Sequence, residues 1–570
     1  MANINSPNPD AANTTIETDT PPRREFLKAS AVAAGATLLA SCGGGGETAA
    51  AFDEAIDDPL TRFDHLVCVM FENRSMDNLL GYLYPKGSAF NGLFTGDYTN
   101  PVPDFINDGH LSVSARPSPG TDADMQNPNP DPGEGYPHIN TQLFGTVDPA
   151  TNAFFPSGEM QAPYNLSTPA KPAAMQGFVH DYCNNFRRQK NRNPTFEEYR
   201  VIMDSFTPAQ LPVLSTLAQS FAVYDAWFSA VPSQTYCNRA FFHASTSSGY
   251  VLNAPHKKWL ENNLAPTIFN RLQDADRTWR IYFDESQLVS LTGLIHVARL
   301  LPYWKSNFRF MTDFYADVAA GNLPDYAFIE PRMMFNHNDF HPPGPLIVDG
   351  LKVPDPSDVR AGDLLLHNIY TAIKASGAPA PGSSALNTLL LVTFDEHGGC
   401  YDHVVPPSAP TPDLLQPAGE QDFYFDRLGL RVPTIAISAH TPANTIVSYP
   451  VNHAALVRTL CRKYKLPHLT NRDIDAQDLR DAVSQAAVRD PSTWPVTVPR
   501  PVPPDAQLSD PTVPPLSKQP LNDLERNIYA LAMTHFTGVE VTDDGIPDTL
   551  GEAYAMLQPR AKGAFGPGNG

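Results

Sequence analysis

Two apolar runs lie far apart in this chain, and each ends in a pair of oxygen-bearing side chains. The runs cover residues 66–71 and 389–394. The four side chains that follow them directly are Glu72, Asn73, Asp395 and Glu396. Unbroken apolar runs of this length are typical of parallel strands that helices cover on both faces. Ligands bind at the carboxyl ends of such strands, so we expect the two pairs to meet at one edge of a sheet.

The rest of the sequence favours one large α/β domain around that sheet. Further strands are predicted over residues 326–329 and 432–438, and a helix over residues 363–374. Residues 97–165 are rich in Gly, Pro, Asn and Asp, which predicts a loop insertion over the sheet edge. We therefore expect a mostly parallel central sheet with helices on both faces and loop insertions.

The C-terminal part of the chain is predicted to pack back on this domain. Residues 490–520 are dense in proline and indicate an extended surface segment. Four apolar residues then fall on one face of a helix: Leu521, Leu524, Ile528 and Leu531. We place the α/β domain at residues 61–489 and the proline-rich segment with its helix at residues 490–570.

The charge balance excludes one class of partner. The chain carries 40 Lys and Arg against 61 Asp and Glu, a formal net charge of −21, and no basic stripe stands out. Nucleic acid is therefore a poor candidate for a surface partner. A small anionic substrate stays compatible with the sequence if a metal ion supplies positive charge locally.

The N-terminus is interpreted as a targeting signal and not as part of the folded domain. Arg23 and Arg24 precede Phe-Leu-Lys and a short apolar run over residues 29–40, which resembles a twin-arginine export signal. Leu-Ala-Ser before Cys42 resembles a lipoprotein cleavage box; the alternative is cleavage nearby that releases a soluble protein. We assign residues 1–41 to the signal and 42–60 to a flexible tether. The expected location is periplasmic or cell-surface, with a lipid anchor at Cys42.

The chemistry of the four strand-end side chains indicates a metal site. Carboxylates and an amide oxygen suit one hard divalent cation such as calcium, magnesium or manganese. Such an ion neutralises a phosphoryl oxygen and lowers the pKa of an attacking hydroxyl. No Cys-x-x-Cys spacing occurs, so a zinc–cysteine site is not expected.

Five longer motifs in the chain resemble one known family. They are F-E-N-R-S-M-D at 71–77, V-P-S-Q-T-Y-C-N-R at 231–239, N-D-F-H-P-P at 338–343, F-D-E-H-G-G-C-Y-D-H-V at 394–404 and F-D-R-L-G-L-R-V-P at 425–433. In this order they resemble the bacterial phosphoesterase superfamily of acid phosphatases and phospholipases C. The resemblance implies an alkaline-phosphatase-like fold.

The resemblance also implies roles for individual residues. The E-N and D-E pairs would bind one metal together with a hydroxyl that acts as covalent nucleophile. That hydroxyl falls on Thr235, with Ser233 as the fallback. His341 would hold a phosphoryl oxygen or protonate the leaving alcohol, and His138 resembles an active-site histidine on a family loop. Arg239 pairs either with a phosphate oxygen or with a carboxylate.

Other features leave alternatives open. His337, His397 and His403 are either secondary groups of the site or structural caps. Cys237 and Cys400 replace the residues usual in their motifs, which puts the substrate preference in doubt.

The function expected first is that of an acid-phosphatase-like phosphomonoesterase acting through a phosphothreonine. The alternative is a phospholipase C acting on phosphatidylcholine-type diesters, and a different class is a catalytically silent binding lipoprotein. The expected ligand is a small phosphate ester or a phospholipid head group.

Overall fold

A computed structural model gives the fold of most of the chain. It describes residues 58–145, 173–334, 337–343, 345–348, 351–354, 357–377, 382–413, 418–502, 518, 521 and 523–566. Arg23, Arg24 and Cys42 lie outside these residues, so the export signal, the lipid anchor and the tether stay predictions.

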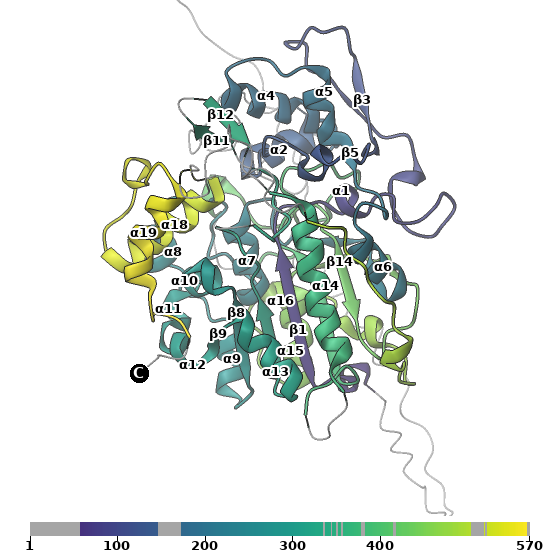
Figure 1. Cartoon of the computed structure of the whole chain (residues 1–570), viewed down its shortest axis with the longest axis vertical. Coiled ribbons are helices and arrows are strands. Elements are labelled where there is room, and N and C mark those ends of the chain that lie inside the picture. Colours follow the sequence, from purple (N-terminus) through teal and green to yellow (C-terminus); the bar gives the residue numbers. More distant parts are fainter. Residues whose placement is uncertain are drawn as a thin grey trace, which may run out of the picture. The chain divides into compact units, whose positions relative to one another are not determined.

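A central sheet of eight strands organises the described residues (Figure 1). From one edge to the other its strands are β15 (Thr445–Val447), β6 (Ala222–Tyr224), β14 (Thr434–Ile437), β13 (Thr388–Phe394), β1 (His65–Phe71), β10 (Tyr326–Ile329), β8 (Trp279–Phe283) and β9 (Phe308–Phe310). All neighbours pair in parallel except β14, which is antiparallel to both β13 and β6. The two predicted apolar strands, β1 and β13, are adjacent at the centre of the sheet.

Helices cover both faces of the sheet, as expected for a mostly parallel sheet. On β8, Trp279 contacts Phe269, whereas Tyr282 contacts Phe314. Residues an odd number of positions apart point to opposite faces of a strand, so these two contacts belong to different layers. One layer contains α7 (Thr235–Ala244), α9 (Ile268–Asp274) and α15 (Ala454–Tyr464); the other contains α6 (Pro212–Ser220), α13 (Met311–Ala320) and α14 (Val359–Ala375). The predicted α/β fold class is confirmed.

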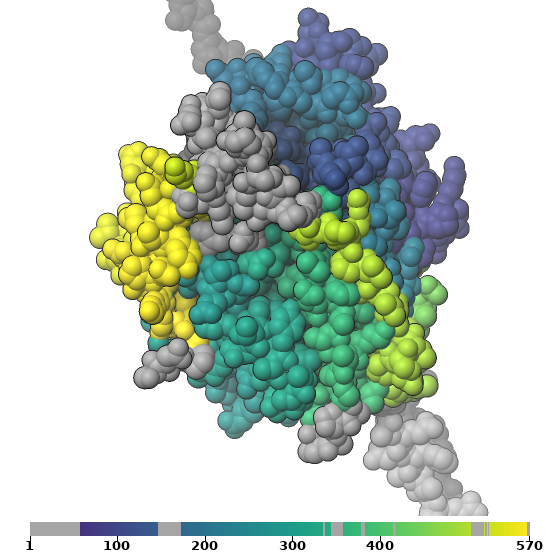
Figure 2. Space-filling view, in the orientation of Figure 1, coloured from purple at the N-terminus to yellow at the C-terminus, as the bar shows by residue number. Residues whose placement is uncertain are grey.

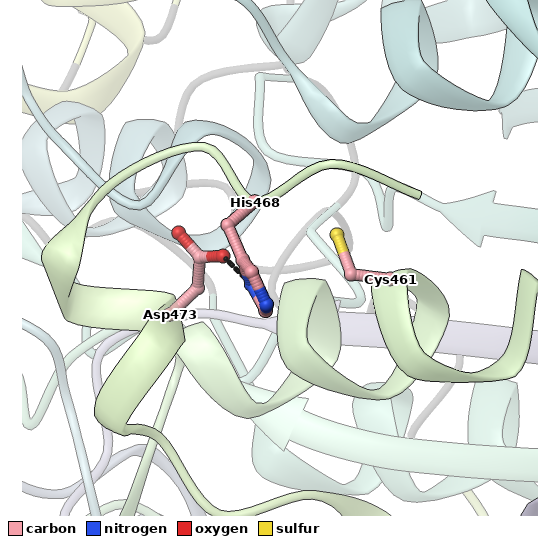
Figure 3. A group of neighbouring side chains, drawn as sticks. All are labelled: Cys461, His468 and Asp473. Carbon is pink, nitrogen blue, oxygen red and sulfur yellow. Dashed lines mark hydrogen bonds and ion pairs between the residues drawn. The ribbon is translucent and has the colours of Figure 1, made fainter. Parts of the chain in front are cut away.

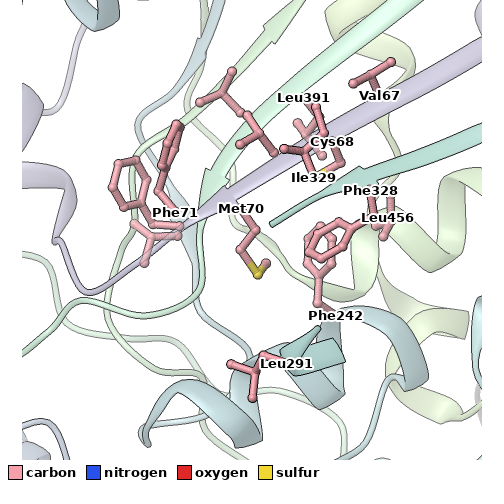
Figure 4. Packing of buried hydrophobic residues seen from close by; sticks show 14 of the residues in the cluster. Val67, Cys68, Met70, Phe71, Phe242, Leu291, Phe328, Ile329, Leu391 and Leu456 are labelled. Carbon is pink, nitrogen blue, oxygen red and sulfur yellow. The ribbon is translucent and has the colours of Figure 1, made fainter. Parts of the chain in front are cut away.

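The core lies between the sheet and these helices. Every residue of β1 after His65 is buried, as is the whole of β13. Figure 4 shows Phe242 of α7 and Leu456 of α15 beside Phe328 of β10, and the rings of Phe242 and Phe328 lie 6.1 Å apart. Burying an aromatic or leucine side chain contributes about 1.5–3 kcal/mol, so this layer holds the strand ends in place.

The segment predicted as a loop insertion is partly helical. The described part of residues 97–165 contains α2 (Tyr136–Phe144) and the short strands β2 (Thr99–Pro101), β3 (Ser112–Ser114) and β4 (Arg116–Pro117). α1 (Met76–Leu80) precedes this segment, and α4 (Phe178–Lys190), α5 (Phe196–Tyr199) and β5 (Asp204–Ser205) follow it. α2, α4 and α5 share a hydrophobic cluster that is separate from the main core. All nine residues of α2 are buried. A helix without an exposed face shows no polar periodicity, so the sequence pattern does not predict it.

Shorter elements complete the described part of the fold. They are α8 (Lys257–Glu261), α10 (Leu291–Ile295), α11 (Val297–Leu300), α12 (Trp304–Asn307), α16 (Asn471–Asp475), β7 (Trp227–Phe228), β16 (Val451–Asn452) and the β11 (Pro345–Val348) and β12 (Leu351–Pro354) hairpin.

The C-terminal helices pack on the catalytic domain. α18 (Asp523–Thr537) contacts α8 and α10, and α19 (Leu550–Ala561) contacts α18. In Figure 2 this yellow segment lies against the teal surface. Leu521, Leu524, Ile528 and Leu531, the predicted apolar face, are all buried. Within the described residues, no helix is both long and apolar enough to cross a membrane.

Candidate active site

The four predicted metal ligands meet at the carboxyl ends of β1 and β13. The register pairs Phe71 with Phe394, so the residues that follow leave the sheet side by side. The amide of Asp395 donates to the carbonyl of Phe71 at 3.0 Å, and the amide of Asn73 donates to Asp395 Oδ1 at 3.1 Å. All four side chains are fully buried. The expected juxtaposition is therefore present.

Several oxygens of this group accept no hydrogen bond although they are buried. They are Asn73 Oδ1, Asp395 Oδ2 and Glu396 Oε1. A buried polar atom without a partner costs roughly 1–3 kcal/mol, so three in one group point to a ligand that they bind together. Three oxygens of this type, two of them from carboxylates, fit a hard divalent cation.

The electrostatics of the group point the same way. Burial raises the pKa of Glu72 well above its usual range; Arg239 opposes that rise, and Asp395 adds to it. Burial also raises the pKa of Glu396, and the charge of Asp395 raises it further. Carboxyl groups this close stay ionised only if positive charge is added. A bound cation would supply that charge.

Two left-handed backbone positions bring the loops after the strands together. Asn73 has φ 54° and Gly398 has φ +62°. A Cβ on Gly398 would lie 2.0 Å from the carbonyl oxygen of Asn73. Only glycine allows this approach of one loop to the other.

Gly398→Ala is therefore expected to destabilise the protein by about 2–4 kcal/mol, because strain and a backbone clash act together. Urea unfolding measures the change. Gly377→Ala is the matched control, since Gly377 has open space around it. Equal stability of the two variants would contradict the close approach.

Thr235 is the first residue of α7, and its side chain faces the predicted ligands. Its Oγ1 donates to Glu72 Oε2 at 3.3 Å, and the residue is fully buried. The helix N-terminus adds a partial positive charge beside this hydroxyl. Ser233, the fallback nucleophile, instead donates its hydroxyl to the carbonyl of Val251. Of the two hydroxyls, Thr235 is the one that contacts the site.

Arg239 follows Thr235 by one helical turn and so lies on the same face of α7. Its Nη2 donates to Glu72 Oε1 and to the carbonyl of Met70, and its Nε lies 3.5 Å from Asp395 Oδ2. Its Nε and Nη1 are buried and make no hydrogen bond. The guanidinium therefore pairs with carboxylates and keeps donors available for a bound anion.

His341 also reaches the group. Its Nδ1 lies 2.7 Å from the carbonyl of Pro342 and its Nε2 lies 3.0 Å from Asn73 Nδ2. A proton on Nδ1 satisfies the first contact and leaves the Nε2 lone pair facing Asn73. Burial lowers the pKa of His341 to about 4, although Asp339 raises it in part. The ring is therefore neutral at pH 7.

The loop before α2 contributes a residue that the sequence did not single out. His138 lies in α2, where its Nδ1 is 2.8 Å from Asp181 Oδ1 and its ring packs beneath Gly133. Glu134, the residue after Gly133, instead contacts Asn73 Nδ2 directly. In the sequence, His138 is the residue of this loop that resembles a family active-site residue. Only the three-dimensional contact with Asn73 identifies Glu134.

The remaining predicted histidines make structural contacts. His397 Nε2 lies 2.8 Å from Gln142 Oε1, and its Nδ1 lies 3.3 Å from Glu396 Oε2. His403 Nδ1 lies 2.6 Å from Asp77 Oδ2. His337 bridges Asp339, at 2.9 Å, and Glu525 of α18, at 3.1 Å.

His453 holds the backbone of the site in place. It directly precedes α15, and its Nε2 lies 2.6 Å from the carbonyl oxygen of Asp395. Trp227 Nε1 donates to its Nδ1 at 3.1 Å, so the proton of the neutral ring is on Nε2. His453 thus fixes the backbone of a predicted ligand without touching the ligand oxygens.

Two other groups with metal-ligand chemistry are accounted for by protein contacts. Asp77, Asp402 and His403 surround Arg431, which donates to both carboxylates. In the second group, drawn in Figure 3, His468 Nδ1 lies 2.8 Å from Asp473 Oδ2, and Asp473 Oδ1 accepts from the amide of Thr470 at the start of α16. We read both as structural pairs. The cysteines of the described residues, Cys68, Cys183, Cys237, Cys400 and Cys461, are all buried free thiols.

Comparisons of the sequence and of the fold found similar known proteins. A model of the phosphoesterase family matches residues 63–467. Non-specific phospholipase C6 of Arabidopsis thaliana is 31% identical over 456 residues, which cover 77% of this chain and 75% of that protein. Phospholipase C B of Mycobacterium tuberculosis is 25% identical over 481 residues, covering 76% and 80%. A crystal structure of a protein in the alkaline phosphatase superfamily from Vibrio parahaemolyticus is similar over 48% of this chain and 65% of its own, at 10% identity and a TM-score of 0.27.

Proposed function

Because the chain belongs to the phosphoesterase family and is a phosphoric ester hydrolase, we propose that it acts as a phospholipase C, with Thr235 as nucleophile. The observation that carries the metal-dependent part is the group of buried oxygens without hydrogen bonds around Asn73, Asp395 and Glu396. The relatives favour the phospholipase alternative over the phosphomonoesterase that the sequence suggested first, since those compared are phospholipases C by name.

In this proposal Glu72, Asn73, Asp395 and Glu396 hold one divalent cation. When bound, the cation neutralises a phosphoryl oxygen and favours ionisation of a nearby hydroxyl. The donor chemistry fits calcium, magnesium or manganese. This fit rests on the buried oxygens of Asn73, Asp395 and Glu396 that accept no hydrogen bond.

The protein's own groups then divide the reaction into two displacements. Thr235 Oγ1 transfers its proton to Glu72 Oε2, with which it is already hydrogen-bonded, and attacks phosphorus. The bond between phosphorus and the glycerol oxygen breaks, and the diglyceride alkoxide takes the proton that Glu72 accepted from Thr235. Water then cleaves the phosphothreonine ester, releasing the phosphorylated head group and restoring the Thr235 hydroxyl.

One residue is placed to bind the phosphoryl group. Arg239 Nε and Nη1 are buried without hydrogen bonds, and they suit a phosphoryl oxygen. His341 is neutral and its Nε2 lone pair faces Asn73, so it accepts a hydrogen bond at the site and adds no charge.

The substrate class is tested by comparing three esters at equal concentration. The purified protein is expected to hydrolyse phosphatidylcholine in mixed micelles with a kcat/KM at least tenfold above that for 4-nitrophenyl phosphate, a monoester. Bis(4-nitrophenyl) phosphate, a soluble diester, is expected to rank between them. A preference for the monoester would return the assignment to an acid-phosphatase-like enzyme, and no turnover of any ester would favour the binding lipoprotein.

A further inference from the structure

The side-chain amide of Asn73 faces two hydrogen-bond acceptors at its nitrogen end. Glu134 Oε2 accepts from Asn73 Nδ2, and His341 Nε2 lies 3.0 Å from the same nitrogen. The His341 ring has its proton on Nδ1, which faces the carbonyl of Pro342 at 2.7 Å, so Nε2 is an acceptor. A primary amide has two N–H groups, one for each of these acceptors.

The oxygen end of the same amide is left for a ligand. Asn73 Oδ1 is buried and accepts no hydrogen bond from the residues that the structure describes. If the amide were turned over, this oxygen would face the Glu134 carboxylate and the His341 lone pair, and the N–H groups would face the cation. A divalent cation binds the oxygen of an amide and not its N–H groups. The contacts with Glu134 and His341 therefore decide which end of Asn73 is presented to the cation.

Glu134 is held on its other side by the residue before the predicted nucleophile. Gln234 Nε2 donates to Glu134 Oε1 at 3.4 Å, and the backbone amide of Asn253 donates to Gln234 Oε1 at 3.2 Å. Because a backbone amide can only donate, it fixes which end of the Gln234 side chain faces Glu134. One carboxylate oxygen of Glu134 is thus directed to Asn73, and the other to the start of α7.

The main chain beside Glu134 is also held in place. Gln142 Nε2 of α2 donates to the carbonyl of Gly133 at 2.7 Å. A Cβ on Gly399, in the loop after β13, would lie 2.5 Å from the same carbonyl oxygen. The loop that carries Glu134 is therefore packed against the loop that follows the predicted ligands of β13. A group held in this way keeps a ligand oriented with little loss of entropy when the cation binds.

We propose that Glu134 is a positioning residue which, together with His341, turns the oxygen of the Asn73 amide toward the cation. The inference rests on the proposed function, since it concerns the cation of the same site. Glu134 acts through Asn73 and contributes no ligand atom itself. Partners that orient a metal ligand typically change the affinity for the metal by about 10- to 100-fold.

The expected loss of cation affinity follows the hydrogen bond and not the charge of Glu134. The protein is stripped with a chelator and titrated with Mn²⁺, and the free ion is followed by electron paramagnetic resonance, so that turnover is not needed. Glu134→Ala is expected to bind Mn²⁺ about tenfold or more weakly than the parent. Glu134→Gln keeps an oxygen that accepts from Asn73, and it is expected to recover most of the affinity. A loss in Glu134→Gln as large as that in Glu134→Ala would overturn the inference.

A second background separates orientation of Asn73 from a general effect on the loop. In Asn73→Asp both ends of the side chain are oxygens, so no orientation remains to be fixed. Adding Glu134→Ala to Asn73→Asp is expected to leave the Mn²⁺ affinity unchanged or to raise it, because two facing carboxylates repel each other. An equal loss in both backgrounds would show that Glu134 only supports the loop, which would also overturn the inference.

Controls separate the remaining failures. Glu197→Ala, at an exposed position of α5, removes the same charge and is expected to bind Mn²⁺ like the parent. Circular dichroism of the metal-free proteins checks the fold, and Glu134→Met repeats the test with a side chain of similar length if the alanine variant does not fold. Equal affinity of these Glu134 variants and the parent would overturn the inference and leave the proposed function standing. A parent that binds no Mn²⁺ and still hydrolyses phosphatidylcholine in excess chelator would contradict both proposals.

Discussion

Replacing Thr235 by alanine is expected to lower kcat by roughly a thousandfold or more, which corresponds to about 4 kcal/mol of transition-state stabilisation. The reason is that Thr235 Oγ1 is the hydroxyl in contact with the predicted ligands, through Glu72 Oε2. Without the attacking oxygen no covalent ester forms, and only slow direct attack by water remains. Steady-state turnover of phosphatidylcholine measures the loss.

Conservative and neighbouring variants make this result specific. Thr235→Ser keeps the hydroxyl and is expected to keep part of the activity. Ser233→Ala removes the hydroxyl that donates to Val251 and is expected to retain the covalent chemistry. Circular dichroism and metal content should match the parent in all three proteins. If Thr235→Ala turns over like the parent, the nucleophile has been misassigned, even if the enzyme class stands.

Asp395→Asn has the second-largest expected effect, a loss of about two to three orders of magnitude in kcat/KM together with most of the bound metal. Asp395 Oδ2 accepts no hydrogen bond and lies 3.5 Å from Arg239 Nε. The neutral amide weakens the cation site and leaves the arginine charge poorly compensated. Metal analysis and turnover are measured on the same sample, and adding excess cation is expected to restore part of the activity.

Asp363 offers a matched control for this substitution. It is a buried aspartate on α14 that accepts from the amides of Val213 and Leu214, and burial raises its pKa to about 7. Asp363→Asn is expected to keep the metal and the turnover, because it lies outside the ligand group. Full activity of a thoroughly demetallated parent would contradict the role given to Asp395.

The centre of the site was predictable because it depends on strand ends. Apolar runs of six residues identified β1 and β13, and the parallel-sheet rule placed Glu72 and Asp395 at one edge. The structure adds the register, Phe71 opposite Phe394, which a sequence pattern does not determine. The antiparallel direction of β14 was also missed, because an apolar run looks the same in either direction.

The loop residues of the site were harder to predict. Glu134 and His138 are four positions apart in a Gly- and Pro-rich segment, where no periodicity indicates which side chain faces the sheet. The buried pair of His138 with Asp181 depends on α4, more than 40 residues later. The sequence also did not predict that His453 holds the backbone of Asp395. Its partner is the carbonyl of Asp395, which is distant in the sequence.

The most direct test of the central claim is to trap the covalent ester on Thr235. Enzyme turning over phosphatidylcholine is quenched rapidly in acid, digested, and its peptides are mapped by mass spectrometry. We predict a phosphocholine ester on the peptide that contains Thr235, absent from Thr235→Ala and from metal-free parent enzyme. A label on Ser233, or no labelled peptide while product forms in a burst, would contradict the account.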